Sequence, residues 1–182
     1  SVRETGRELG AAHFIEHMVF KGTERRTAEQ IAIEMDAVGG MLNAFTSKEC
    51  TCFYAKVLDE HLPLAMDMLS DIALHSKFEM APLRKEKSVI VEEILMMEDS
   101  PEDMAAEVAN KLFFGDDPLS RPILGTEKSV RAFTRELLLS YKEKHYCAKN
   151  IVIACAGHFE PKELIELVEK EFGELSEGEA AP

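Results

Sequence analysis

Two histidines and a glutamate near the start of the chain have the spacing of a metal site. His13 and His17 are four residues apart, so on an α-helix they lie about 40° from each other on one face. Glu16 lies about 60° from His13 on the same side. Two imidazoles on adjacent turns can bind one divalent metal, and a carboxylate beside them that is not a ligand can take a proton from water. The order His-x-x-Glu-His is the inverse of the common zinc-protease motif His-Glu-x-x-His, so this pattern predicts a zinc hydrolase site.

A catalytic zinc usually has three protein ligands, so two histidines leave one position to fill. The best place to look is a helix predicted over residues 81–97, whose apolar residues form one face centred on Ile90. Glu86 and Glu93 fall about 40° and 60° from Ile90, on or beside that face, whereas Glu92 falls on the solvent side. Carboxylates on a buried face are costly unless they are paired or bind a metal. The pattern therefore favours Glu93 as the third ligand. It leaves Glu86 as a second ligand candidate or a carboxylate that orients a ligating histidine, with buried salt bridges to Lys or Arg as the structural alternative.

The elements that must position these residues are mostly helical. The first helix is expected over residues 10–20, and Phe20 falls on its histidine side, where it could line a pocket. Alternating apolar residues over 41–58 predict two strands joined by a turn at 47–49, and a continuous β-branched run at 151–156 predicts a buried strand. Further helices are expected after the capping box at Thr27 and over residues 62–74, 100–114, 134–146 and 161–172. This order indicates an α+β fold in which a modest mixed or antiparallel sheet is covered by several helices.

Composition narrows the class of protein. The 182 residues are 46% apolar and 30% charged, which is typical of one globular domain. No run approaches the roughly 20 apolar residues that a membrane span needs. The net charge of −13 argues against nucleic acid as a partner, because binding to phosphates needs a basic surface.

Taken together, the motifs resemble one family of peptidases. The resemblance is carried by residues 13–18, 20–23, 43–46 and 86–94 and extends over essentially the whole chain. These segments look like those of the M16 (pitrilysin, insulinase and mitochondrial processing peptidase β-like) zinc metallopeptidases. The resemblance implies a LuxS/MPP-like metallohydrolase half-domain in which His13, His17 and Glu93 bind one Zn²⁺ per chain. It also implies that Glu16 is the general base and that Glu86 supports the metal ligands without binding the metal itself.

The same resemblance implies a substrate and a partner. Asn43 and Ala44 match the edge strand on which such enzymes bind an extended peptide by β-augmentation. The implied activity is that of a zinc-dependent endopeptidase acting on extended oligopeptides or unfolded segments. Because the family closes over its substrate with a homologous second half, we expect residues 1–175 to be an N-terminal-type catalytic domain lacking its first strands. Residues 176–182 would then be a linker to a C-terminal half. A separate partner subunit or a homodimer could instead supply that half. We expect the protein in the bacterial cytoplasm or, if the chain is eukaryotic, in the mitochondrial matrix.

Two other functions compete with this interpretation. M16-like chains also serve as structural subunits of a respiratory complex or as inactive partners of a peptidase, although such chains usually have a broken motif. An S-ribosylhomocysteine lyase also uses His-x-x-Glu-His on a small chain, with a cysteine as third ligand. Cys147 is the candidate for that role. Exchange of Glu93 or of Cys147 for alanine, followed by metal counting, separates the peptidase from the lyase.

Overall fold

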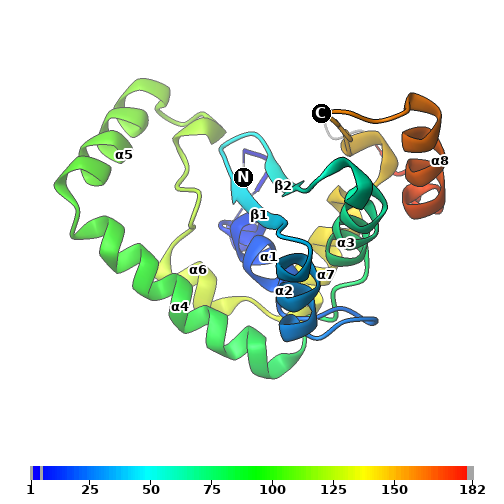
Figure 1. Cartoon of the computed structure of the whole chain (residues 1–182). Coiled ribbons are helices and arrows are strands. Elements are labelled where there is room, and N and C mark those ends of the chain that lie inside the picture. The colour runs from blue at the N-terminus through cyan, green and yellow to red at the C-terminus, as the bar shows by residue number, and fades with distance from the viewer. Residues whose placement is uncertain (1, 5, 180–182) are drawn as a thin grey trace. The chain divides into compact units, whose positions relative to one another are not determined.

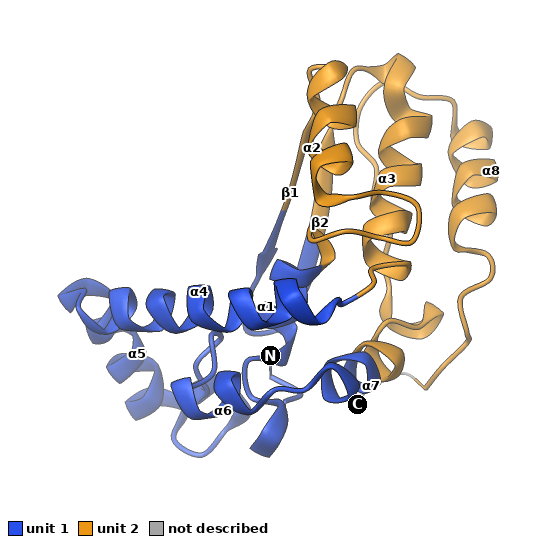
Figure 2. Cartoon of the chain, turned by 90° about the horizontal axis from the view of Figure 1, so that it is seen from below, with its two compact units in different colours: residues 1–18, 44–52, 78–141 blue, residues 19–43, 53–77, 142–182 orange. Residues whose placement is uncertain are grey.

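The computed structural model describes residues 2–4 and 6–179. By its internal contacts the chain divides into two compact units, each assembled from three stretches of sequence (Figure 2). Unit 1 comprises residues 1–18, 44–52 and 78–141, and unit 2 comprises residues 19–43, 53–77 and 142–182.

The fold is mostly helical with one small antiparallel sheet, which confirms the α+β class (Figure 1). The helices and strands are α1 (Ala11–Val19), α2 (Ala28–Ala37), β1 (Met41–Thr46), β2 (Thr51–Lys56), α3 (Leu62–Leu74), α4 (Met80–Glu98), α5 (Pro101–Phe114), α6 (Glu127–Ala132), α7 (Arg135–His145) and α8 (Pro161–Phe172). The predicted helix over 62–74 has these same bounds, and the helix predicted over 81–97 corresponds to α4. The capping box at Thr27 is present, with Gln30 as its partner.

The start of α1 is fixed by a buried acid and a glycine of unit 1. Glu4 is fully buried, and its two carboxylate oxygens accept hydrogen bonds from the backbone N–H groups of Gly10 and Ala12, at 2.8 and 2.7 Å. These are among the donors that a helix leaves unsatisfied at its N-terminus. Gly10 has φ +90°, and a Cβ there would lie 2.6 Å from the carbonyl oxygen of Leu124. The beginning of the histidine-bearing helix is therefore held in place by two independent constraints.

The face of α1 opposite the histidines forms part of the core of unit 1. Phe14, Ile15 and Met18 have no exposed surface. The ring of Phe14 meets that of Phe133 edge to face, with centroids 5.3 Å apart. Because this face is locked by packing, the histidine side of α1 has a fixed orientation.

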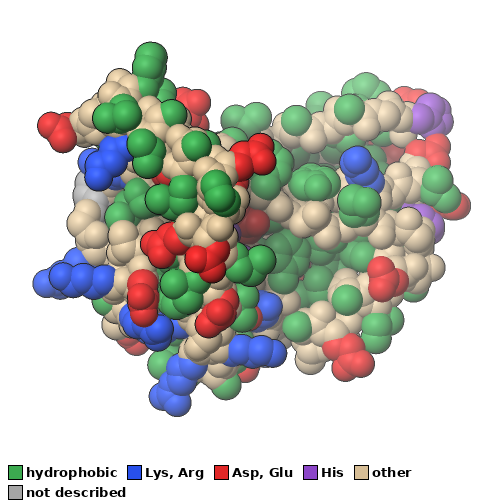
Figure 3. Space-filling view, turned by 90° about the vertical axis from the view of Figure 1, so that its left-hand side faces the viewer, with side chains coloured by type: hydrophobic (Ala, Val, Ile, Leu, Met, Phe, Trp, Pro, Cys, Tyr) green, Lys and Arg blue, Asp and Glu red, His purple; other side chains and the backbone are tan. Residues whose placement is uncertain are grey.

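Helix α4 places carboxylates beside its apolar face, as its pattern predicts. Leu83, Ile90 and Ile94 are buried, and so is Glu86. The following helix, α5, exposes Val108, Leu112 and Phe113, and hydrophobic side chains lie among acidic and basic ones on the face that carries α4 and α5 (Figure 3). An exposed apolar group of this kind is a surface that another protein segment can cover.

Unit 2 contains α2, α3 and α8, and a network of ion pairs joins its segments. Arg26 lies within 2.8 Å of carboxylate oxygens of both Glu34 and Asp71. Ser70 of α3 donates a hydrogen bond to Glu171 of α8, at 3.0 Å. Polar and charged side chains thus connect elements that are distant in sequence.

The prediction of a buried strand over residues 151–156 is wrong. This segment has no strand or helix assignment, and Val152 is 92% exposed instead of buried. The run has the right residues for a strand, but a strand also needs a hydrogen-bonded neighbour. Within the described ranges the sheet holds only β1 and β2, so residues 151–156 have no ladder to join.

Part of the expected linker is hydrogen-bonded to an earlier segment of the chain. The carbonyl oxygens of Ser176 and Glu177 accept hydrogen bonds from the backbone of Ala148 and Lys149. Residues 180–182, the rest of the expected linker, lie outside the described residues.

Among the residues that the structure covers, no helix has both the length and the apolar character to cross a membrane.

Candidate metal centre

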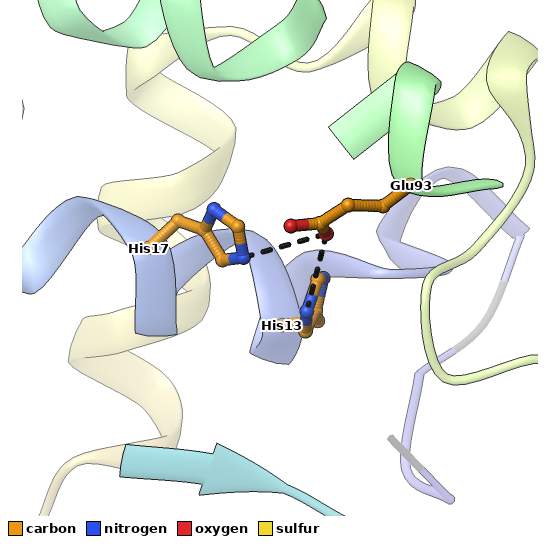
Figure 4. Close-up of side chains that lie close together, drawn as sticks. All are labelled: His13, His17 and Glu93. Atoms are coloured by element: carbon orange, nitrogen blue, oxygen red, sulfur yellow. Dashed lines mark ion pairs between the residues drawn. The ribbon is translucent and has the colours of Figure 1, made fainter. Parts of the chain in front are cut away.

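Helices α1 and α4 of unit 1 bring the two histidines and one glutamate to a common point. The Nε2 atoms of His13 and His17 lie 3.8 and 3.6 Å from the same carboxylate oxygen of Glu93, Oε2 (Figure 4). One potential ligand atom from each residue falls within 4.8 Å of the other two. Ligands bonded to one tetrahedral zinc ion lie about 3.4 Å from one another, given bonds of about 2.1 Å. The observed spacing is close to that of three ligands around a single ion.

Glu86 sits behind one of these histidines. Its carboxylate is 3% exposed and lies 3.1 Å from Nδ1 of His17. Because a carboxylate oxygen accepts, Nδ1 of His17 is the donor, and the lone pair of Nε2 then points toward Glu93. A carboxylate that fixes the tautomer and orientation of a histidine in this way is characteristic of metal sites. Of the two roles left open for Glu86 by the sequence, the geometry favours the orienting one.

The electrostatics of the cluster favour a bound cation. Burial, together with the neighbouring ring of His17, lowers the pKa of His13 to about 4, so its imidazole is neutral and able to bind a metal. Burial also raises the pKa of Glu93, against an opposing effect of His17, and the nearby carboxylates of Glu86 and Glu16 add to the rise. Within the described ranges, the buried Nδ1 atom of His13 has no hydrogen-bond partner. Two imidazoles facing several carboxylates are a donor set for a divalent cation, and these residues fit zinc.

Glu16 lies beside the cluster without belonging to its three ligand atoms. The group of potential ligands found among the described residues consists of His13, His17 and Glu93. Oε2 of Glu16 accepts a hydrogen bond from the hydroxyl of Thr46, at 2.5 Å. A carboxylate held next to a metal site, and not within it, is placed as a general base would be.

The remaining predicted site residues lie on or near the hairpin and the end of α1. Asn43 is exposed on β1, Ala44 follows it with a partly buried side chain, and Phe20 is partly buried in the turn after α1. Cys147 is buried, and Asn150 lies 3.3 Å from its sulfur as a donor. Cys147 is not in the group of potential metal ligands found in the described part of the chain, so the lyase alternative gains no support.

Sequence reasoning missed one contact in this region. Thr46 ends β1 and reaches Glu16 across elements that are 30 residues apart. The alternation of β1 places Ala44 and Thr46 on the same side of the strand. That periodicity was the available signal, but it does not show which helix the strand approaches.

Comparison with known proteins places the chain among peptidases. Residues 1–127 match the family described as insulinase (peptidase family M16), and residues 132–182 match the peptidase M16 inactive domain. An uncharacterized zinc protease of Bacillus subtilis is 46% identical over 173 residues, which are 95% of this chain and 42% of that protein. An uncharacterized zinc protease of Mycobacterium tuberculosis is 45% identical over 164 residues, 90% of this chain and 37% of that protein. The chain thus spans about two fifths of the length of these relatives.

Solved structures share the fold. A protease from Helicobacter pylori superposes with a TM-score of 0.92 at 21% identity, covering 100% of this chain and 44% of that one. The periplasmic protease PqqL from Escherichia coli gives a TM-score of 0.87 at 24% identity, covering 100% of this chain and 21% of that one. The α+β arrangement of this chain therefore recurs within larger proteins.

Proposed function

Because the chain belongs to the insulinase family of peptidases, M16, we propose that it is a zinc-dependent endopeptidase that hydrolyses peptide bonds in extended oligopeptides or unfolded segments. The observation that carries this proposal is the convergence of His13, His17 and Glu93 beside Glu16. The description of its relatives as zinc proteases supports the choice of metal.

His13, His17 and Glu93 would hold one zinc ion per chain, the histidines through their Nε2 atoms. Glu86 would keep the ring of His17 turned toward the ion through the contact at Nδ1. When bound, zinc supplies a Lewis acid that polarises the scissile carbonyl and makes the attacking water more acidic.

Glu16 would carry the proton in the reaction. Its Oε2 atom is engaged by Thr46, so Oε1 is the atom that accepts a proton as water attacks the scissile carbonyl carbon. Glu16 then delivers this proton to the nitrogen of the leaving amine as the C–N bond breaks. The other two carboxylates are committed elsewhere, Glu93 to the cluster and Glu86 to His17.

The substrate would bind along β1. Among the described residues β1 pairs with β2 alone, so its outer side is an edge of the sheet. An extended peptide adding to this edge near Asn43 and Ala44 would be held by backbone hydrogen bonds, which tolerate many sequences. Met41 and Phe45, each 50% exposed, would contact its side chains.

We further propose that residues 1–175 act as the N-terminal-type catalytic domain, and that residues 176–182 lead to a homologous second half. A separate subunit or a second copy of the chain could supply that half. The length of the relatives, of which this chain covers about two fifths, supports a contribution from further protein. A non-catalytic role in such an assembly is the second candidate, favoured by the match of residues 132–182 to an inactive domain.

Cleavage of an unstructured peptide, followed with and without a chelator, tests the proposal. The protein is made from its complete gene, and turnover should require zinc. Glu16→Gln should retain zinc and lose turnover by at least about 100-fold, because the proton acceptor is gone. Glu92→Gln is the matched control, since Glu92 is exposed on α4, and it should leave turnover unchanged.

Full activity in Glu16→Gln would contradict the assignment of the base. Stoichiometric zinc with no cleavage of any extended peptide by the wild-type protein would favour the non-catalytic role. Absence of zinc from the wild-type protein would contradict the metal site itself.

A further inference from the structure

The hydroxyl of Thr46 is the point where the hairpin meets the proposed general base. Thr46 ends β1 and Thr51 begins β2, and the turn between them is closed by a hydrogen bond of 2.8 Å from Ser47 N–H to the carbonyl of Cys50. Thr46 and Thr51 are therefore direct neighbours across the hairpin. Their hydroxyl oxygens are 3.2 Å apart, and that of Thr46 is 2.5 Å from Oε2 of Glu16.

The direction of these hydrogen bonds follows from the groups themselves. A threonine hydroxyl has one proton and two lone pairs, whereas an ionised carboxylate only accepts. Because the single proton of Thr46 goes to Glu16, the contact between the two threonine hydroxyls must use a lone pair of Thr46, with Thr51 as the donor. The result is a directed chain from Thr51 to Thr46 to Glu16.

We propose that Thr46 is a positioning residue for Glu16, and that Thr51 orients the hydroxyl of Thr46. This inference rests on the proposed peptidase function. Glu16 has several rotatable side-chain bonds, and a hydrogen bond at Oε2 restricts them so that Oε1 is presented for proton transfer. A general base must lie within hydrogen-bond reach of the water proton, so its orientation affects the rate directly.

The position of Thr46 in the strand gives this contact a second consequence. Ala44, part of the proposed peptide-binding edge, is two residues before Thr46 and points to the same side of β1. The strand that would bind the substrate therefore also orients the base. A peptide added to β1 would rigidify the element that holds Glu16, so the length of substrate bound along β1 should influence kcat as well as KM.

Three substitutions test the proposal in protein made from the complete gene. Thr46→Val removes the hydroxyl while keeping the shape and the strand preference of the residue. It should lower kcat by about 10- to 100-fold, with KM and zinc content within about twofold of the wild-type values. Thr46→Ser keeps the hydroxyl and should restore kcat to within about threefold. Thr51→Val should have a smaller effect, about two- to fivefold, because Thr46 keeps its bond to Glu16.

A crystal structure of the zinc-free Thr46→Val variant provides a readout that does not depend on activity. The carboxylate of Glu16 should leave the position it has in the wild-type protein, and Thr46→Ser should return it. An unmoved Glu16 in Thr46→Val, or failure of Thr46→Ser to rescue kcat, would overturn the inference.

Failure of the proposed function would look different. A wild-type protein that cleaves no peptide contradicts the peptidase, and the position of Glu16 in the two crystal structures then decides the role of Thr46 alone. If Thr46→Val does not fold, the comparison of Thr46→Ser with Thr51→Val decides it. A wild-type kcat in Thr51→Val would contradict the role of Thr51 in orienting the hydroxyl of Thr46.

Discussion

Glu86 of unit 1 and Asp71 of unit 2 are both buried carboxylates, and their surroundings neutralise them differently. In unit 2, Asp71 is fully buried and meets two guanidinium groups, those of Arg25 at 3.2 Å and Arg26 at 2.8 Å. In unit 1, Glu86 is almost equally buried, and its described ion-pair partner is the imidazole of His17. A guanidinium group is always charged, whereas an imidazole can also serve as a metal ligand. The first cluster carries its own cations, whereas the proposed zinc ion would supply the cation of the second.

The pKa shifts of the two clusters show the same difference. Although burial opposes it, the guanidinium groups of Arg25 and Arg26 lower the pKa of Asp67, next to Asp71 in the network. In the α1–α4 cluster, burial raises the pKa of Glu93 and lowers that of His13. Both shifts disfavour the ionised forms, and a divalent cation would reverse the one at Glu93. The network of unit 2 is thus complete as a structure, and the cluster of unit 1 has the properties of a binding site.

Removing a ligand should produce the largest effect. His17→Ala deletes one Nε2 ligand and also the partner of Glu86, so zinc affinity should fall by at least about 1000-fold, or about 4 kcal/mol. Zinc content after dialysis, measured by mass spectrometry, should drop from one per chain to nearly none. His75→Ala is the control, because His75 is exposed. Stoichiometric zinc in His17→Ala would remove the distinction between the two clusters.

The opposite pattern is expected in unit 2. Asp71→Asn leaves the guanidinium groups of Arg25 and Arg26 facing a neutral side chain, and should lower the free energy of unfolding by about 3 kcal/mol. Zinc content should stay at the wild-type value. Glu34→Gln, at the exposed edge of the same network, should cost less than about 1 kcal/mol. Urea denaturation measures both variants, and a loss of zinc on Asp71→Asn would show that the network is not purely structural.

What could be predicted about the candidate site depends on spacing within single helices. His13 and His17 share a face of α1 because they are four residues apart, and Glu93 was chosen over Glu92 because only Glu93 falls beside the apolar face of α4. The structure brings these three side chains together. Both arguments use the helical period alone.

Contacts between elements could not be obtained in this way. The bond from Thr46 to Glu16 requires the hairpin to approach α1, and nothing in the local pattern of either segment encodes that approach. Residues 151–156 fail for the same reason, since β-branched residues show that a strand is possible but not that a neighbour is present. The Arg26–Asp71 pair joins residues 45 apart and was likewise not anticipated.

A smaller effect on zinc affinity is expected for Glu86, which contacts a proposed ligand without being one. Glu86→Gln keeps the size of the side chain but weakens the hold on Nδ1 of His17, and should reduce zinc affinity by about 10- to 100-fold. Competition with a chromogenic chelator measures the change, with Glu92→Gln as the matched control on the same helix. If both variants bind zinc equally, Glu86 does not support the metal site, and its role is structural like that of Asp71.

The smallest predicted effect concerns Lys142 of unit 2 and tests how the burial of a charged side chain affects the free energy of unfolding. Its side chain is 9% exposed, and its ammonium group donates to the carbonyl of Leu74 at 2.7 Å. Burial lowers the pKa of Lys142 to about 8, against a smaller opposing effect of Glu24. An unfolded lysine titrates near pH 10.4, so between about pH 8 and 10.4 the unfolded state binds more protons. The free energy of unfolding should therefore rise with pH across this window, and the cost of burying the charge is greatest below pH 8.

Lys142→Met should remove that pH dependence. At pH 7 the variant gains at most about 3 kcal/mol by avoiding the buried charge and loses about 1 kcal/mol with the hydrogen bond to Leu74, a net gain of about 1–2 kcal/mol. The gain should shrink steadily from pH 8 to 10, because the wild-type lysine is then neutral in the folded state. Urea denaturation at several pH values, with the exposed Lys144→Met on the same helix as control, measures the difference. A constant offset between wild type and Lys142→Met at all pH values would mean that Lys142 remains charged when folded. Its burial would then be compensated by partners, as at Asp71, in contrast to the cluster around His13 and His17.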